Sequence, residues 1–504
     1  MYREMELNNI PDIPLRLILN MLDCHTILYK LPLVSNYISG MVKTIPIHLD
    51  IPAITEYKWD NTKLSIMLNI ICNEYKVIGI KIPWFWNMVT MSDILINFSS
   101  ITHISLKYDE IFSVSWVCMV PLYNTICKIL PRIKYLDVQN WIIPNKYTEQ
   151  LFWNNQLQHL TLPNSMLDKN SLEKICICKY LTSLYIPYSK YIDDDIIKKI
   201  SDGCTRLSKL IICSNNITDQ GIEYISSLPL VNLQITPYYG KLISGICIKN
   251  IKTMKILKLC RSGITDTQLQ KILQNCLNLQ ELALPGSENI TDEGFNVKKW
   301  SKYITHLNLD ECLHLTGQGI SHISTGCKLR TLSFESIFKI KDRYLSSILL
   351  HSPDLIYLSL IKCKISNYGI SSLYKKCPYL EKLYLSDTLI TTRYMSTLVE
   401  NLPNLSVLCV DSIGITDETI PKLPTGLVQL HMDNTTIFYN DLCNIMERCP
   451  NIIYLSVENI DISSVEMYNF MTKYPTLEKV YVDVWIADNI YKLFSSIHRY
   501  NPDA

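Results

Sequence analysis

Residues 405–418 read LSVLCVDSIGITDE, and this stretch decides the fold. Its apolar residues follow the pattern L-x-x-L-x-V, a further apolar residue stands at Ile413, and the stretch ends in an I-T-D block. The last two apolar positions alternate with polar ones, as expected for a short strand with one buried face. The same frame recurs about every 25 residues, and a fixed period of that length predicts one elongated stack of repeats.

Fifteen strands can be placed between residues 130 and 485, in steps of 22 to 26 residues. Their central apolar residues are Leu136, Leu160, Leu184, Leu210, Leu233, Leu257, Leu282, Leu307, Leu332, Leu358, Leu383, Leu408, Leu430, Leu455 and Val480. Less regular copies of the frame begin at Pro46, Val77 and Ile101, so residues 51–129 are predicted to be an entry region of degenerate repeats. Residues 486–504 are expected to form a helix that closes the last repeat.

Five residues after most strand centres lies a small or hydrogen-bonding residue that can turn the chain. These residues are Ser165, Ser189, Asn215, Ser262, Ser287, Cys312, Cys363, Thr388 and Thr435. An I-T-D block then follows in four repeats, at residues 217–219, 264–266, 290–292 and 415–417. Thr or Asp there is a suitable N-cap, and Leu269, Ile272 and Leu273 show the spacing of an amphipathic helix.

Six cysteines stand just ahead of a strand, where other repeats have proline: Cys178, Cys204, Cys276, Cys327, Cys377 and Cys449. With the repeat frame, they make residues 130–485 similar to the cysteine-containing subclass of leucine-rich repeats. This resemblance implies an α/β horseshoe with parallel strands on the concave face and helices on the convex face. No pair of cysteines has the spacing of a zinc site, so buried structural thiols are expected, with no metal and no other cofactor.

Residues 1–50 do not follow the repeat frame and predict three short helices. Ile10-Pro11, then Ile18-Leu19 with Leu22, then Leu33-Val34-Ser35 resemble the blocks of an F-box, although Ile13 stands where an acidic residue is usual. The resemblance implies that this segment docks a Skp-type adaptor of a cullin-RING ubiquitin ligase, while the repeats bind a protein substrate. The residues expected at the adaptor are Pro11, Leu15, Ile18, Leu22, Leu33 and Val34. The alternative is a helical cap on a protein-interaction scaffold that has no link to a ligase.

The outward strand positions, one before, one after and three after each central residue, line the predicted concave face. Acidic residues gather there in the second half of the array, at Asp310, Glu335, Asp411, Asp433, Glu458 and Asp483. Tyrosines stand among them, at Tyr357, Tyr384, Tyr454 and Tyr481. Because tyrosine is enriched at binding centres, these ten residues predict a docking face for a basic protein surface. A solvated polar face is the alternative.

Composition and motifs exclude other classes of function. The 48 Lys and Arg balance 47 Asp and Glu, so the whole chain has no attraction to nucleic acid or to an acidic membrane. No glycine-rich phosphate loop, H-E-x-x-H or G-x-S-x-G is found, which argues against an enzyme. The outward lysines are scattered, which disfavours a small polyphosphate or hormone ligand; they are Lys209, Lys258, Lys382 and Lys479.

The expected compartment is reducing, either cytoplasm or nucleus. Eighteen cysteines are spread over the chain, and the first 30 residues lack the pattern of a signal peptide. The most apolar run, residues 114–130, is interrupted by Pro121, Asn124 and Lys128, so a soluble protein is expected.

Overall fold

A computed structural model describes residues 47–50, 77–82, 95–96, 100–106, 120–138, 156–162, 167–186, 189–214, 216–236, 252–484 and 486. The chain divides into two compact units, Met1–Tyr239 and Gly240–Ala504. The predicted F-box-like helices and their six adaptor-binding residues lie outside the described residues. So does the predicted closing helix, apart from Ile486, which is buried.

The first unit contains a run of parallel strands, each paired with the next along the chain. The strands are β1 (Ile47–Asp50), β2 (Val77–Ile82), β3 (His103–Leu106), β4 (Tyr135–Asp137), β5 (His159–Thr161), β6 (Ser183–Ile186), β7 (Lys209–Cys213) and β8 (Asn232–Thr236). The three irregular copies of the frame therefore do form strands, and they pair in the same way as the regular ones. Strand β1 lies at the end of residues 1–50, the segment that was predicted to form three short helices.

The second unit continues the pattern with a second run of parallel strands, paired in sequence order. They are β9 (Ile256–Leu259), β10 (Glu281–Ala283), β11 (His306–Asn308), β12 (Thr331–Ser333), β13 (Tyr357–Ser359), β14 (Lys382–Tyr384), β15 (Val407–Cys409), β16 (Gln429–His431), β17 (Tyr454–Ser456) and β18 (Lys479–Tyr481). All fifteen predicted strand centres are confirmed, because each lies in a strand and pairs with the next centre within its unit.

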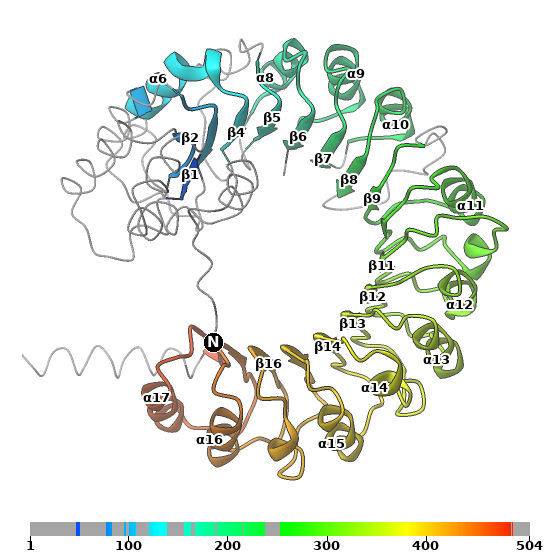
Figure 1. Cartoon of the computed structure of the whole chain (residues 1–504), viewed down its shortest axis with the longest axis vertical. Coiled ribbons are helices and arrows are strands. Elements are labelled where there is room, and N and C mark those ends of the chain that lie inside the picture. Colours follow the sequence, from blue (N-terminus) through cyan, green and yellow to red (C-terminus); the bar gives the residue numbers. More distant parts are fainter. Residues whose placement is uncertain are drawn as a thin grey trace, which may run out of the picture. The chain divides into compact units, whose positions relative to one another are not determined.

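Helices connect most of the strands. They are α6 (Val120–Ile129), α8 (Lys169–Glu173), α9 (Asp194–Gly203), α10 (Asp219–Ile225), α11 (Asp266–Asn275), α12 (Gln318–Ser324), α13 (Asp342–Leu350), α14 (Leu373–Lys376), α15 (Thr392–Glu400), α16 (Tyr439–Arg448) and α17 (Ser464–Lys473). Short 3₁₀ turns are η6 (Leu130–Arg132), η7 (Lys174–Ile177), η8 (Asp292–Phe295) and η9 (Ile420–Lys422). Within the second unit the strands line the inner side of a curve and the helices lie outside it (Figure 1).

The apolar frame fills the space between strands and helices. Leu383, the centre of β14, and Leu385, just after the strand, are fully buried. In α11, Leu269, Ile272 and Leu273 are buried as predicted. Burial of this kind in every repeat stabilises the stack, because each repeat covers the apolar edge of its neighbour. The chain is therefore an α/β solenoid of leucine-rich repeats.

A left-handed turn follows each strand from β9 to β17, four residues after the strand centre. Gly286 occupies this position in one repeat, and residues other than glycine occupy it with φ between 50° and 62° in the others. Its backbone N–H donates to a carbonyl of the following repeat, as in Glu311 to Glu335 at 2.7 Å and Asn434 to Glu458 at 2.8 Å. These bonds offset the cost of placing residues with a Cβ in this region.

The next position, five residues after the centre, bonds the backbone in several repeats, as predicted, whereas the Ser262 and Ser287 hydroxyls bond each other at 2.7 Å. Ser165 and Asn215 lie outside the described residues. Thr435 Oγ1 donates to the Met432 carbonyl at 2.7 Å, and Cys363 Sγ donates to the Phe334 carbonyl of the preceding repeat at 2.8 Å. The cysteines ahead of the strands behave alike: Cys449 Sγ donates to the Pro424 carbonyl at 3.3 Å. Burial raises the pKa of the Cys363 thiol to about 12 and that of Cys449 to about 11, so both stay protonated. The prediction of buried structural thiols is confirmed for these positions.

The last two residues of the I-T-D block have different roles: the threonine caps the helix that follows, and the aspartate bonds the next repeat. Thr218 and Thr291 are N-caps, each accepting the N–H of the second residue after it, at 3.2 Å. The aspartate reaches the next repeat: Asp292 accepts from Thr316 Oγ1 at 2.7 Å and from Gly319 N at 3.0 Å. Asp266 makes the same bridge to the backbone N–H of Thr291 at 2.7 Å. The block therefore caps its own helix and bonds the neighbouring one.

The fourth I-T-D block differs from this prediction. No α-helix begins at Thr416, and the first helical residues after it form η9, whose N-cap is Thr419. Pro421 explains the difference, because proline in the second turn of a helix begun at Asp417 would remove one hydrogen bond and clash with the preceding turn.

Replacing Asp292 with alanine leaves the N–H groups of Thr316 and Gly319 without their acceptor. We expect the free energy of unfolding to fall by about 2 kcal/mol, read from the urea midpoint at unchanged m. The matched control is Asp417→Ala, the exposed aspartate of the fourth block, which should change stability by less than about 0.5 kcal/mol. Equal losses in the two variants would contradict a bridging role for Asp292.

Candidate binding surface on the strand face

The predicted surface residues all lie on the strand side of the second unit, on or just after β11 to β18. Most are partly buried: Asp310, Glu335, Asp411 and Asp433 have intermediate exposure, whereas Glu458 is exposed. The structure thus brings the predicted acids and tyrosines together on consecutive strands of one face. Their hydrogen bonds show that they do not all have the same role.

The six predicted acids, Asp310, Glu335, Asp411, Asp433, Glu458 and Asp483, are together called the acidic column, and two of its aspartates bond the following repeat. Asp310 Oδ1 accepts from Ser333 Oγ at 2.6 Å and from the backbone N–H of Glu335 at 2.8 Å. Asp433, five repeats later, makes the same arrangement, accepting from Ser456 Oγ at 2.9 Å and from Glu458 N at 2.7 Å. Both carboxylates therefore hold the end of the next strand in place.

Asp411 and Asp483 also accept backbone N–H groups. Asp411 Oδ1 accepts from Asp433 N at 2.8 Å, and its Oδ2 accepts from Ser386 Oγ at 2.9 Å. Asp483 accepts from Asn459 N at 3.1 Å. These structural roles were missed from sequence, where the column was interpreted only as a docking face or a solvated face. The sequence does contain a signal for these bonds. An outward aspartate, Asp310 or Asp433, is followed in the next repeat by a serine directly after the strand centre, Ser333 or Ser456.

Aromatic rings form two clusters on the same face. Tyr357 and Tyr384 have ring centroids 5.2 Å apart. Tyr454 lies between His431, at 4.9 Å, and Tyr481, at 5.0 Å. His431 was not among the predicted binding residues. Tilted rings at these distances attract one another and offer rigid contact area to a partner.

The two most perturbed phenols on this face remain neutral hydrogen-bonding groups. Burial is the largest cause that raises the pKa of Tyr357 to about 12, followed by Tyr384 and the negative charge of Asp310. Burial and then the neighbouring Tyr481 raise the pKa of Tyr454 to about 12. Burial and the charge of Asp310 also raise the pKa of the Glu335 carboxyl. The face therefore carries a negative potential close to its first aromatic cluster.

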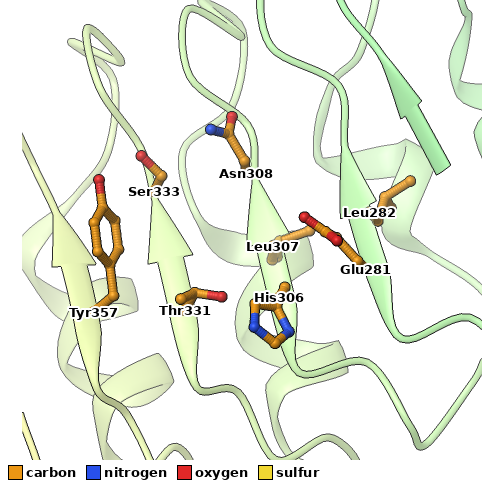
Figure 2. Close-up of a pocket in the computed structure, with 8 residues that line it drawn as sticks. All are labelled: Glu281, Leu282, His306, Leu307, Asn308, Thr331, Ser333 and Tyr357. Carbon is orange, nitrogen blue, oxygen red and sulfur yellow. The ribbon is translucent and has the colours of Figure 1, made fainter. Parts of the chain in front are cut away.

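A pocket of about 210 Å³ opens on this face across β10, β11, β12 and β13 (Figure 2). Its polar lining comes from six residues: Glu281, His306, Asn308, Thr331, Ser333 and Tyr357. Only Tyr357 was predicted from sequence. The pocket forms because the short side chains of Thr331 and Ser333 lie between the longer Tyr357 on one side and Glu281 on the other (Figure 2).

Most polar groups of the pocket have partners within the protein. Glu281 Oε1 lies 2.6 Å from Lys258 Nζ, and Asn308 Nδ2 donates to Asp310 Oδ2 at 2.7 Å. His306 Nδ1 is 2.7 Å from Thr305 Oγ1. Thr331 Oγ1, by contrast, is buried and has no hydrogen-bond partner among the described residues. A buried hydroxyl in this state is a place where a ligand group can gain a hydrogen bond.

The first unit carries a smaller aromatic row on its own strand face. The rings of His103 and Tyr135 are 5.7 Å apart, and those of Tyr135 and His159 are 5.6 Å apart. Burial and then the charge of Lys209 lower the pKa of His159. None of these three positions was predicted as a binding residue from the sequence, although all three precede a strand centre by one residue.

Among the described residues, no group of three or more His, Cys, Asp and Glu side chains is arranged to hold a metal ion. Within the same residues, no helix has both the length and the apolar character needed to cross a membrane.

No protein-family model matches the chain. Among curated proteins, the F-box protein SKIP19 of Arabidopsis thaliana is 30% identical over 127 residues. That match takes in 19% of this chain and 42% of the relative, so the chain spans less than half the length of the curated protein it resembles.

Three solved structures have a similar arrangement. The Rad7 and Elc1 complex of yeast matches with a TM-score of 0.45 and 16% identity, over 82% of this chain and 93% of that chain. The leucine-rich-repeat protein LIC12759 of Leptospira interrogans gives 0.41 and 17%, over 83% and 98%. An internalin of Listeria monocytogenes, inlF, gives 0.39 and 17%, over 71% and 88%. With all three scores below 0.5, the fold assignment rests on the chain's own strands and repeats.

The structure separates stability from recognition in the acidic column. Asp433→Ala removes the acceptor of Ser456 and of the Glu458 N–H, so we expect the free energy of unfolding to fall by about 2 kcal/mol. Glu458→Lys, at the exposed neighbour, should change it by less than about 0.5 kcal/mol. Urea denaturation followed by circular dichroism measures both. If Glu458→Lys lowered the free energy of unfolding as much as Asp433→Ala, the two residues would not differ in their contribution to stability, and the assignment would be contradicted.

Proposed function

We propose that the protein is the substrate-recognition adaptor of a Skp-cullin-F-box type ubiquitin ligase. The observation that carries this proposal is the F-box-like pattern of Pro11, Ile18-Leu19, Leu22 and Leu33-Val34-Ser35, which stands directly ahead of a leucine-rich-repeat solenoid. The sequence match to an F-box protein of Arabidopsis thaliana supports it. The front segment docks the Skp-type adaptor, and the strand face captures the protein to be modified.

This role needs binding groups rather than catalytic ones. A protein that binds both the ligase and its substrate raises the effective concentration of one for the other, and the transfer of ubiquitin is carried out by the partners. The strand face of the second unit suits the substrate side. Its tyrosines supply rigid contact area, and its exposed or half-buried acids favour a partner with a basic surface, as Glu335 and Glu458 illustrate.

The proposal also places the protein in the cytoplasm or the nucleus. The described cysteines are all free thiols. Several are buried hydrogen-bond donors between repeats, such as Cys312 to the Leu284 carbonyl at 3.2 Å. Thiols in such positions fit a reducing compartment, where ubiquitin ligases of this type work.

The test is capture of purified Skp-type adaptor by the full-length chain. We expect binding by the wild type, at least a tenfold loss in the double variant Leu22→Asp with Val34→Asp, and unchanged binding by Glu458→Lys. Circular dichroism and the urea midpoint establish that each variant has kept the solenoid. If the wild type itself does not bind, the proposal is rejected in favour of a scaffold with a helical cap.

A further inference from the structure

The pocket across β10 to β13 is too small for a cofactor and large enough for one side chain. Its volume of about 210 Å³ is below the roughly 300 to 1,000 Å³ of typical small-molecule sites. Its side walls are the longer side chains of β11 and β13, and the short Thr331 and Ser333 of β12 lie between them (Figure 2). A single long side chain projecting from a bound protein matches this space.

The charges around the pocket favour a cation. Glu281 lies on one wall, where its Oε1 pairs with Lys258 Nζ at 2.6 Å and its second carboxylate oxygen has the capacity to accept a further hydrogen bond. Asp310 lies next to the pocket, because it accepts hydrogen bonds from the lining residues Asn308 and Ser333, and it also accepts the backbone N–H of Glu335. The pKa of Tyr357 is raised in part by Asp310 and Glu335, which shows that their negative potential extends to the wall of the pocket.

The hydrogen-bonding groups favour a planar cation with several donors. The Thr331 hydroxyl is buried without a partner and points into the pocket, toward the side where Glu281 lies (Figure 2). These two residues are on β12 and β10, two strand spacings apart, which is about 9.5 Å at the backbone. An arginine guanidinium carries five N–H donors in a flat fork and can address both groups at once, whereas a lysine ammonium is a point charge. The ring of Tyr357 offers an apolar wall for the stem of the same side chain.

We propose that this pocket is the anchor site for one arginine side chain of the protein captured on the strand face. His306 stands between Thr331 and Glu281 in the strand register, so the guanidinium lies over the His306 ring, within reach of the Thr331 hydroxyl and the Glu281 carboxylate, and the aliphatic stem packs against Tyr357. This inference rests on the proposed role of the strand face in substrate capture and names the chemistry that the face selects. It does not depend on the F-box-like segment.

The experiment uses the full-length chain labelled with ¹³C at threonine methyl groups, with the Thr331 methyl signal assigned from Thr331→Ser. The probes are Nα-acetyl-arginine amide, its citrulline counterpart, which is neutral and has nearly the same shape, and its lysine counterpart. We expect the arginine probe to shift the Thr331 signal saturably with a Kd on the order of millimolar, as for a ligand of about fifteen atoms. The citrulline and lysine probes should bind at least fivefold more weakly.

Two variants make the test specific. Glu281→Gln keeps the size of the side chain but leaves the Lys258 cation beside the pocket, so arginine binding should weaken at least fivefold. The matched control is Glu447→Gln on the outer helix α16, a glutamate that also pairs with a lysine, Lys473 at 3.4 Å, and it should not change binding. The proposal is overturned if the arginine probe gives no saturable shift, if citrulline binds equally well, or if Glu281→Gln has no effect.

The result is independent of the ligase assignment. Glu281→Gln should bind Skp-type adaptor as the wild type does, since the pocket lies in the second unit, away in sequence from residues 1–50. If adaptor capture fails while the arginine probe binds at Thr331, only the proposed ligase role falls. If adaptor capture succeeds while the probe does not bind, the anchor site falls and the adaptor role stands.

Discussion

In the second unit, the carboxylate of one repeat accepts the backbone N–H of the next, and the arrangement of the strand face depends on this bond. Asp310, Asp411 and Asp433 make it at the ends of the strands. Asp266 and Asp292 make its counterpart at the start of the helices. Each of these bonds joins one pair of neighbouring repeats, either at the ends of their strands or at the start of their helices. Since a solenoid has only nearest-neighbour contacts, such bonds fix the spacing at which every other side chain is presented.

The same bonds divide the strand face between structure and recognition. The aspartates of the acidic column use their oxygens on serine hydroxyls and backbone N–H groups, and removing one would leave buried donors unpaired. Recognition then falls to side chains beside them, among which the tyrosines and Glu281 have surface to offer. Burial is the main cause of the raised pKa of Tyr357, and the negative charge of Asp310 adds to it, so this bonded aspartate still acts on the surface beside it. An aspartate that is hydrogen-bonded within the protein thereby influences which partner binds, through its charge and without touching that partner.

The sequence predicted the strands well because their signal is local. A centre such as Leu408 and its apolar neighbours lie within six residues, and their period repeats without interruption. The role of Asp433 was missed because its partners, Ser456 and Glu458, lie in the next repeat, so that only the strand register brings them together. The pocket was missed for a similar reason, since it arises from the contrast between Thr331 and residues on three other strands. The left-handed turn at residues such as Lys362 was also hidden, because glycine usually marks that conformation.

Amide hydrogen exchange at single-residue resolution tests the bond between repeats most directly. The N–H groups of Glu335, Asp433 and Glu458 lie near the surface, at the ends of short strands, yet each donates to a carboxylate of the preceding repeat. We expect all three to exchange at least about 100-fold more slowly than the amide of the exposed turn residue Phe338. Exchange of the three amides at the rate of Phe338 would contradict the account.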